Sequence, residues 1–156
     1  MTGPKIPQAV LFAALIAVCS GATAAFAELG GGAETIDVDR AHFSAKMSSS
    51  IAPDHMTYTL LPNYGGTVHE FANANGMVFA ISWHSPGRPD LRQLLGTHFG
   101  AFNSDLAART GRRMSRQVIT RRSDIVVQTA GHPGAFFGIA YLPSLLPQGT
   151  SINDLP

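Results

Sequence analysis

The sequence is poor in cysteine and in charged residues. One of its 156 residues is cysteine, and 13% are Asp, Glu, Lys or Arg. A single thiol excludes an internal disulfide and any metal site built from several cysteines. The 11 basic side chains nearly balance the 10 acidic ones, for a formal net charge of +1. This balance gives no overall reason to expect nucleic acid as a partner.

Familiar catalytic motifs are missing as well. The sequence contains no Gly-x-Ser-x-Gly nucleophile elbow, no phosphate-binding glycine loop and no dinucleotide-binding fingerprint. His69-Glu70 begins like a zinc-protease motif, but Asn73 stands where that motif needs its second histidine. None of the 6 histidines pairs with another at a short metal-ligand spacing. We therefore expect no metal and no other cofactor.

Residues 1–27 have the three-part layout of a secretory signal peptide. Lys5 supplies a positive charge, residues 9–18 are apolar, and Ala25-Phe26-Ala27 is a small-x-small cleavage site. We expect cleavage after Ala27, which leaves residues 28–156 as a single domain in the periplasm or outside the cell. The apolar run is shorter than the roughly 20 residues that cross a bilayer as a helix, so we expect no stable membrane insertion after cleavage.

Two alternatives to release stay open. The segment would act as an uncleaved anchor if the peptidase did not act, or it would end in a lipid on Cys19. Against lipidation, Val18 stands where a lipoprotein peptidase prefers a small residue. Cleavage after Ala27 would remove both Cys19 and Lys5, and it would leave a thiol-free domain with balanced charge.

The middle of the chain carries strand and hairpin patterns. Residues 56–61 alternate between polar and apolar types as in a strand. Residues 67–72 and 77–84 flank Asn73-Ala74-Asn75-Gly76, and Asn-Gly between two apolar runs is a strong hairpin signal. We predict a three-residue loop with Gly76 in the left-handed conformation and a bulge at Gly76.

The length of this loop decides which side chains share a face. A three-residue loop pairs Glu70 with Ala80 and Phe71 with Phe79, and this register separates the large apolar groups from Glu70. A two-residue turn would place Glu70 opposite Ile81 instead. It would also bring His69 and His84 to one face, so a metal shared by these histidines requires the register that we do not favour.

Helical patterns come before and after this hairpin. Residues 35–47 suit a short helix, and residues 48–54 resemble a turn. Asp90 suits a helix N-cap, with Gln93 three residues later as in a capping box. An apolar stripe then runs from Leu91 to Leu106. The glycines at 96 and 100 weaken this helix, and we place a break near Asn103.

The last third of the sequence indicates strands. The candidates are residues 117–121, 124–130 and 135–142, and the last two form a hairpin around residues 131–134. Residues 135–142 are apolar on both faces, as in a central strand. The predicted fold class is therefore α+β, a single small domain whose antiparallel sheet is covered by one or two helices.

Several residues are candidates for contact with a ligand or partner. They are Trp83, His84, Arg88, Asp90, Arg92, His132, Arg112 and Arg113. Structural roles explain some of them equally well, because Trp83 suits a core aromatic, Asp90 a helix cap and His132 an exposed turn. If these residues form a site, it should be concave and contain groups with shifted pKa values.

A basic segment lies between Asp105 and Asp124. It contains six arginines and no acidic residue: Arg109, Arg112, Arg113, Arg116, Arg121 and Arg122. The simpler interpretation is a solvated connector between two packed elements. The alternative is contact with a phosphate or carboxylate group through bidentate arginines.

Two long motifs resemble the domain-of-unknown-function 2844 family. They are MVFAISWHSPGRPDLRQLLG at residues 77–96 and GHPGAFFGIAYLPSLLPQG at residues 131–149. The resemblance covers nearly all of residues 29–154 and implies a small exported bacterial protein, and it assigns no activity or catalytic residue. Before Glu70 the family pattern has an arginine where this chain has His69, which makes His69 a weaker candidate for chemistry.

These observations favour a non-enzymatic, exported binding or envelope-accessory domain, whose partner is an envelope protein or a small ligand. One alternative is a periplasmic hydrolase of uncommon type that uses Glu70, His84 or His132 as acid or base. Another alternative is a structural protein that associates with copies of itself. The first alternative requires at least two of its three residues to meet in one cleft.

Overall fold

The structure is a computed structural model, and it describes residues 29–109 and 117–156. The predicted signal peptide at residues 1–27 lies outside the described residues, as do Arg112 and Arg113. Within the described ranges, no helix is both long and apolar enough to cross a membrane.

The described residues form three α-helices, seven strands and four 3-10 turns. The α-helices are α1 (Ile36–His42), α2 (Leu91–Leu95) and α3 (Phe99–Ala107). The strands are β1 (Lys46–Ile51), β2 (His55–Leu61), β3 (Thr67–Asn73), β4 (Val78–Ser85), β5 (Gln117–Arg121), β6 (Val126–His132) and β7 (Ala135–Tyr141). The 3-10 turns are Ala33–Thr35, Gly96–His98, Pro143–Leu145 and Ile152–Asp154.

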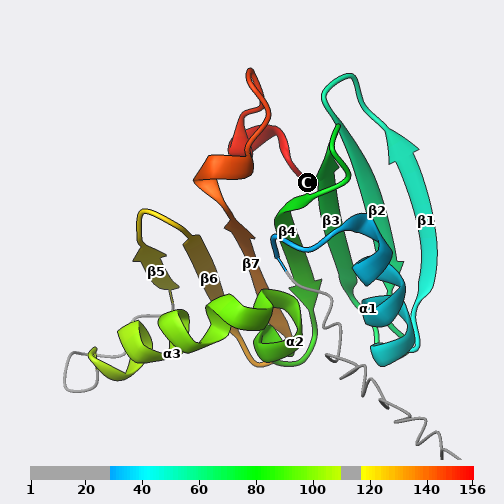
Figure 1. The fold of residues 1–156 in the computed structure, drawn as a ribbon. Coiled ribbons are helices and arrows are strands. Elements are labelled where there is room, and N and C mark those ends of the chain that lie inside the picture. Colours follow the sequence, from blue (N-terminus) through cyan, green and yellow to red (C-terminus); the bar gives the residue numbers. More distant parts are fainter. Residues whose placement is uncertain (1–28, 110–116) are drawn as a thin grey trace, which may run out of the picture.

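All seven strands belong to one antiparallel sheet in the order β1-β2-β3-β4-β7-β6-β5. Figure 1 shows α1 at the β1–β3 end of the sheet, α2 near the middle by β4 and β7, and α3 extending toward the β5 end. The predicted hairpin of β6 and β7 is confirmed, and so is the central place of β7, which pairs with both β4 and β6. The α+β class and the antiparallel sheet are likewise as predicted.

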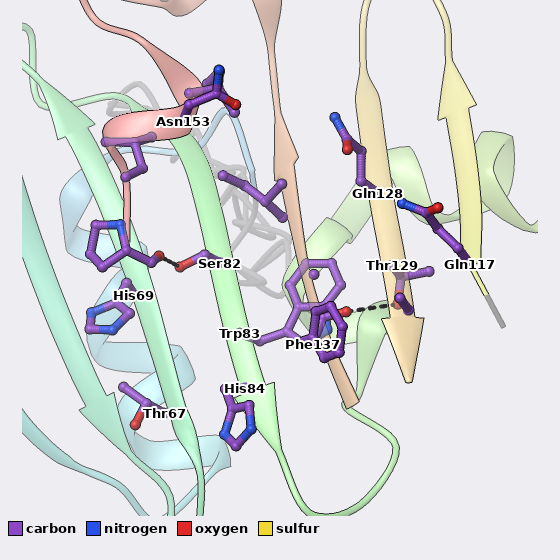
Figure 2. Close-up of a pocket in the computed structure, with 16 residues that line it drawn as sticks. Thr67, His69, Ser82, Trp83, His84, Gln117, Gln128, Thr129, Phe137 and Asn153 are labelled. Carbon is purple, nitrogen blue, oxygen red and sulfur yellow. Dashed lines mark hydrogen bonds between the residues drawn. The ribbon is translucent and has the colours of Figure 1, made fainter. Parts of the chain in front are cut away.

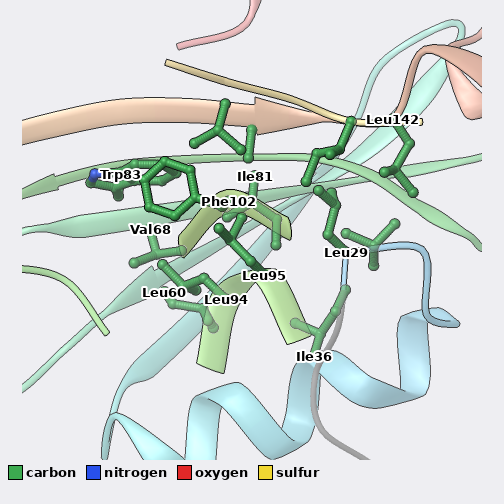
Figure 3. Packing of buried hydrophobic residues seen from close by; sticks show 14 of the residues in the cluster. Leu29, Ile36, Leu60, Val68, Ile81, Trp83, Leu94, Leu95, Phe102 and Leu142 are labelled. Carbon is green, nitrogen blue, oxygen red and sulfur yellow. The ribbon is translucent and has the colours of Figure 1, made fainter. Parts of the chain in front are cut away.

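The main hydrophobic core lies between the sheet and the helices. Strand residues such as Leu60, Val68 and Ile81 meet Leu94 and Phe102 from the helices there (Figure 3). Each of these strand residues points to the same side because side chains alternate along a strand. We call this side of the sheet the helix side. The apolar stripe predicted for the helices thus packs on the sheet, except for its last residue, Leu106, which is 40% exposed.

The opposite side of the sheet, which we call the open face, carries a smaller core. Phe71, Phe79 and Ala80 pack there against partly buried residues of the segment after β7, including Leu145 and Leu155. Residues 143–156 therefore cover part of the open face, and polar contacts hold them in place. Asn73 Nδ2 donates to the Leu145 carbonyl at 3.2 Å, and the Thr150 hydroxyl donates to the Asp54 carboxylate.

The loop between β3 and β4 has the predicted length. The Asn73 N–H donates to the Met77 carbonyl at 2.9 Å, and the Gly76 N–H donates to the Asn73 carbonyl at 2.8 Å. These bonds enclose a loop of residues 74–76. Gly76 has a φ of +74°, in the left-handed region that glycine enters without a steric penalty. The three-residue loop is confirmed.

The register predicted for this hairpin is wrong. Glu70 lies opposite Ile81 and Phe71 lies opposite Ala80, because the pairing shifts by one residue between Phe71 and Ala72. The shift makes Phe79 an additional residue in β4, a β-bulge. Phe79 and Ala80 then both pack with Phe71 on the open face, while Ile81 enters the main core.

The first predicted helix is shorter than expected, and the predicted turn after it is a strand. Helix α1 ends at His42, and Ser44 reverses the chain with a φ of +47°. Strand β1 then occupies Lys46–Ile51, where the serine run at residues 48–50 suggested a turn. Pairing with β2 overrides the weak local preference of these serines.

The second helical segment breaks at Gly96 rather than near Asn103. Gly96 ends α2 with a φ of +51°, and a short 3-10 turn leads into α3. Because side chains rarely adopt this backbone conformation, glycine is the natural site of the break. Asn103 lies within α3.

Candidate functional site

The predicted contact residues border two grooves on opposite sides of the sheet. Arg88, Asp90 and Arg92 line a groove on the helix side. Trp83 and His84 are among the residues around a groove on the open face. These five residues therefore do not form the single pocket that their closeness in sequence suggested.

The helix-side groove has a volume of about 630 Å³, within the usual range for small-molecule sites. Its lining residues are Arg88, Pro89, Asp90, Leu91, Arg92, Phe99, Phe102, Asn103, Leu106, Val118, Thr129, Ala130, Gly131 and Phe136. They come from the loop before α2, from α2 and α3, and from strands β5, β6 and β7. Most of the side chains are apolar, so the groove offers an apolar surface to a ligand.

Two arginines give one end of the helix-side groove a positive charge. Arg88 and Arg92 are exposed, and neither forms an ion pair with a carboxylate of the described residues. The Arg92 Cζ atom lies 4.6 Å from the centre of the Phe99 ring, a cation–π contact that holds the guanidinium against the apolar wall. Unpaired guanidinium groups are well suited to a carboxylate or phosphate.

The other end of the groove is uncharged. Helix α3 runs from α2 toward the β5 edge of the sheet (Figure 1), and Leu106 lies in its last turn with 40% of its surface exposed. Val118 of β5 and the buried Phe102 line the same groove. The groove therefore joins a cationic end to an apolar channel.

Asp90 is a helix cap, as the sequence predicts. Its Oδ1 atom accepts the Gln93 N–H at 3.1 Å, which satisfies a free donor at the start of α2. Its Oδ2 atom lies 3.2 Å from His42 Nε2. Among the described residues, Asp90 forms no ion pair with Arg88 or Arg92, so the cap leaves the two guanidinium groups available.

The open-face groove has a volume of about 430 Å³ and a different chemistry. Its polar side chains include Thr67, His69, Ser82, His84, Gln117, Gln128, Thr129 and Asn153 (Figure 2). Phe137, half exposed, provides an aromatic surface. Among the described lining side chains, only those of the two histidines are able to carry a charge. None of these described side chains carries a fixed charge like that of Arg88 and Arg92 in the helix-side groove.

His69 and His84 share the open face because of the observed register. His69 lies opposite Ser82, and His84 lies opposite Thr67. His69 Nδ1 is 3.0 Å from the Thr59 hydroxyl, and partial burial lowers the pKa of His69 below its usual value. The two histidines thus lie on one face, as a metal bound by both of them would need. However, the described residues hold no group of three or more His, Cys, Asp or Glu side chains that could bind a metal ion.

Trp83 is a core residue. Only 3% of its surface is exposed, and it packs on the helix side with Val68 and Ile81. Gly138 pairs with it in β7, and a Cβ atom at that glycine would lie 2.4 Å from the Trp83 ring. The absence of a side chain at Gly138 therefore makes room for the indole.

The three residues of the hydrolase alternative are spread over the fold. Glu70 is buried on the helix side, whereas His84 is exposed on the open face. His132 is exposed at the end of β6, and its Nδ1 atom lies 2.9 Å from the Pro133 carbonyl oxygen. His132 belongs to the described lining of neither groove. This arrangement does not favour acid–base catalysis by these residues.

Glu70 meets a second carboxyl group that the sequence analysis missed. Asp39 of α1 and Glu70 of β3 are 0% and 1% exposed, and a hydrogen bond joins their side chains. Gln93 Nε2 of α2 donates to Asp39 Oδ1 at 2.8 Å. Asp39 and Glu70, which we call the carboxyl pair, thus link α1 and α2 to the sheet.

Burial keeps the carboxyl pair protonated to unusually high pH. Desolvation raises the pKa of Asp39 to about 6, with the hydrogen bond from Gln93 acting in the opposite direction. Desolvation also raises the pKa of Glu70 well above its usual value, and the neighbouring Asp39 adds to this rise. Asp39 Oδ2 and Glu70 Oε1 find no other donor among the described residues. A proton held between the two carboxyls supplies one.

Residues 25–155 match the family described as "Protein of unknown function (DUF2844)". No curated protein and no solved structure matches the chain.

Proposed function

This chain belongs to the DUF2844 family, and we propose that it is an exported domain that binds an anionic amphiphile in the helix-side groove. The ligand class is a carboxylate or phosphate group on an apolar chain. The observation that carries the proposal is that two arginines without ion-pair partners and an apolar channel lie in one groove of about 630 Å³. A non-enzymatic role agrees with the separation of Glu70, His84 and His132.

The two ends of the groove would bind different parts of the ligand. Arg88 and Arg92 would hold the anionic group, since charge-assisted hydrogen bonds to guanidinium are among the stronger ones in proteins. Leu106, Val118 and Phe136 would cover the apolar chain, which gains free energy in proportion to the apolar area removed from water. Neither end alone explains the ligand class.

The N-terminal sequence supports the exported location. A charge at Lys5, the apolar run at residues 9–18 and the site at Ala25-Phe26-Ala27 are the parts that a signal peptidase substrate needs. Intact-mass measurement of the protein from a periplasmic extract should give a chain that starts at Glu28. A retained leader or a lipid on Cys19 would contradict release.

A calorimetric titration with dodecanoate, kept below its micelle concentration, tests the ligand class. The double variant Arg88→Gln/Arg92→Gln should bind dodecanoate at least about tenfold more weakly, which corresponds to the roughly 1.4 kcal/mol expected from losing charge-assisted hydrogen bonds. The same variant should bind the neutral dodecanol as the unchanged protein does. Leu106→Gln should weaken both ligands, because it makes the shared apolar channel polar.

A matched control changes two arginines outside the groove. Arg40 and Arg121 are exposed on α1 and β5, so Arg40→Gln/Arg121→Gln removes the same charge and should leave dodecanoate binding unchanged. If both double variants bound dodecanoate equally weakly, the effect would come from the overall charge of the protein and not from the groove. Dodecanoate that fails to bind the unchanged protein, or that binds Arg88→Gln/Arg92→Gln as tightly, would overturn the proposal.

A further inference from the structure

Strand β1 is the most exposed strand of the described sheet. All six of its residues are exposed, including Met47 and Ile51 with 40% and 83% of their surface accessible. Among the described residues, β1 pairs with β2 on one edge, and no strand pairs with the other edge. An open edge of this kind is a template for pairing with another chain.

The hydrogen-bond pattern identifies which groups face the open edge. The Ala52 N–H donates to the His55 carbonyl at 2.9 Å, so Ala52 and His55 form a hydrogen-bonded pair. Such pairs alternate along an antiparallel ladder. The main-chain groups of Lys46, Ser48 and Ser50 therefore point to β2. Those of the residues between and beyond them, Met47, Ser49 and Ile51, point outward.

We propose that the chain forms a two-fold homodimer in which the β1 strands of two copies pair antiparallel about Ser49. In this register Ser49 faces the partner's Ser49, and Met47 faces the partner's Ile51. It is the register that pairs the outward N–H and C=O groups of all three residues on both copies. The result is one sheet that runs through both protomers.

The side chains of β1 suit this register. Directly opposed residues lie on the same face, so each exposed Ile51 would pack against the partner's Met47. Lys46 faces the partner's Ala52, which avoids a contact between like charges. It also lies diagonal to the turn that carries the partner's Asp54, whose carboxylate has a pKa held below the usual value by the Thr150 hydroxyl. Two symmetric pairs of opposite charge would follow.

Strand β1 lacks the features that usually prevent an exposed edge from pairing with another chain. Within Lys46–Ile51 there is no proline and no bulge, and its single charge, on Lys46, stands at the end rather than in the middle. Because six residues from each copy make a small interface, we expect a dimer that dissociates on dilution. The proposal is independent of the helix-side groove, whose residues lie at the opposite end of the sheet.

Light scattering coupled to size exclusion, over a range of protein concentrations, tests the dimer. The unchanged protein should move from monomer to dimer mass as its concentration rises. Ser49→Pro should stay monomeric, since it removes an outward N–H without breaking the ladder to β2. Ile51→Lys should also stay monomeric, because it puts a charge against the partner's Met47. Ser104→Lys places the same charge on an exposed position of α3 outside the groove lining, and it should dimerise as the unchanged protein does.

A cross-link tests the register. In a Cys19→Ser background, Ser49→Cys should form a disulfide-linked dimer under mild oxidation, because the two Cα atoms face each other at about 5.5 Å. Ser48→Cys should form far less, because the two thiols are offset along the strands. A monomer at every concentration, or a dimer that survives both Ser49→Pro and Ile51→Lys, would overturn the proposal. A dimer that is lost in these variants but not cross-linked through Ser49→Cys would overturn the register.

Discussion

His69 and Glu70 are neighbours in β3, yet they belong to two different environments. Glu70 points to the helix side, where it is fully buried and shares a hydrogen bond with Asp39. His69 points to the open face, where it is half buried and contacts the Thr59 hydroxyl. The alternation of a strand thus separates a packed side, which uses burial to control charge, from a partly open side lined by neutral polar groups.

The two sides also present different grooves. The helix-side groove combines Arg88 and Arg92 with an apolar channel, whereas the open-face groove combines neutral polar side chains with Phe137. Of the two grooves, the one on the helix side has lining side chains with fixed positive charge, Arg88 and Arg92. A ligand with an anionic group is therefore expected on the helix side.

Tight packing of the helix side gives the largest expected effect. Gly138→Ala would place a Cβ atom 2.4 Å from the Trp83 ring and 2.4 Å from the Gln128 carbonyl oxygen. Neither neighbour is a flexible side-chain end, so we expect a loss of about 3 kcal/mol or more in the free energy of unfolding. Urea denaturation measures this loss.

A second glycine provides the matched control. A Cβ atom at Gly100, in the first turn of α3, would meet nothing within 4 Å. Gly100→Ala should therefore stabilise the protein, by at most about 1 kcal/mol, through helix propensity. Equal effects of Gly138→Ala and Gly100→Ala would show that the helix side is not the packed side.

The carboxyl pair on the helix side and His69 on the open face should change the stability of the protein in opposite directions as the pH rises. Because the folded pKa of Asp39 is raised to about 6 and that of Glu70 is also raised, the folded protein holds more protons than the unfolded chain between about pH 4 and 6. The stability that this pair supplies is therefore complete at low pH, and it is lost as the pH rises through that window. The expected loss is of the order of 1–3 kcal/mol.

His69 contributes with the other sign. Its folded pKa is lowered, so its contribution is complete above the ordinary value of about 6.5 and is lost as the pH falls below that value toward the folded pKa. Denaturation at several pH values should show that Glu70→Gln flattens the fall in stability toward neutral pH, and that His69→Gln flattens the loss toward acid. Glu34→Gln, on an exposed 3-10 turn, is the control. A Glu70→Gln profile parallel to that of the unchanged protein would contradict a raised pKa.

The sequence was informative wherever a local rule dominates. The Asn75-Gly76 loop, the Asp90 cap and the β6–β7 hairpin each rest on neighbouring residues with fixed backbone or hydrogen-bond requirements. Gly96 is an intermediate case. The sequence predicts that the glycines at 96 and 100 weaken the helix but places the break near Asn103, whereas α2 ends at Gly96.

Features that depend on distant residues were not predictable in this way. The bulge at Phe79 arises because Phe71 and Ile81 are needed on opposite sides of the sheet. Strand β1 forms because β2 offers it a ladder, despite its serine run. The carboxyl pair requires Asp39 of α1 to meet Glu70 of β3, and no sequence spacing signals that contact. The division of the contact residues between two grooves follows from the same alternation.

The position of a bound ligand shows directly which of the two grooves binds an anionic amphiphile. Isotope-filtered nuclear Overhauser spectroscopy on the labelled protein with unlabelled dodecanoate detects which methyl groups touch the chain of the ligand. Contacts to Leu106 and Val118 in the helix-side groove are the predicted result. Contacts to Ile139 and Ile152 in the open-face groove would contradict the account.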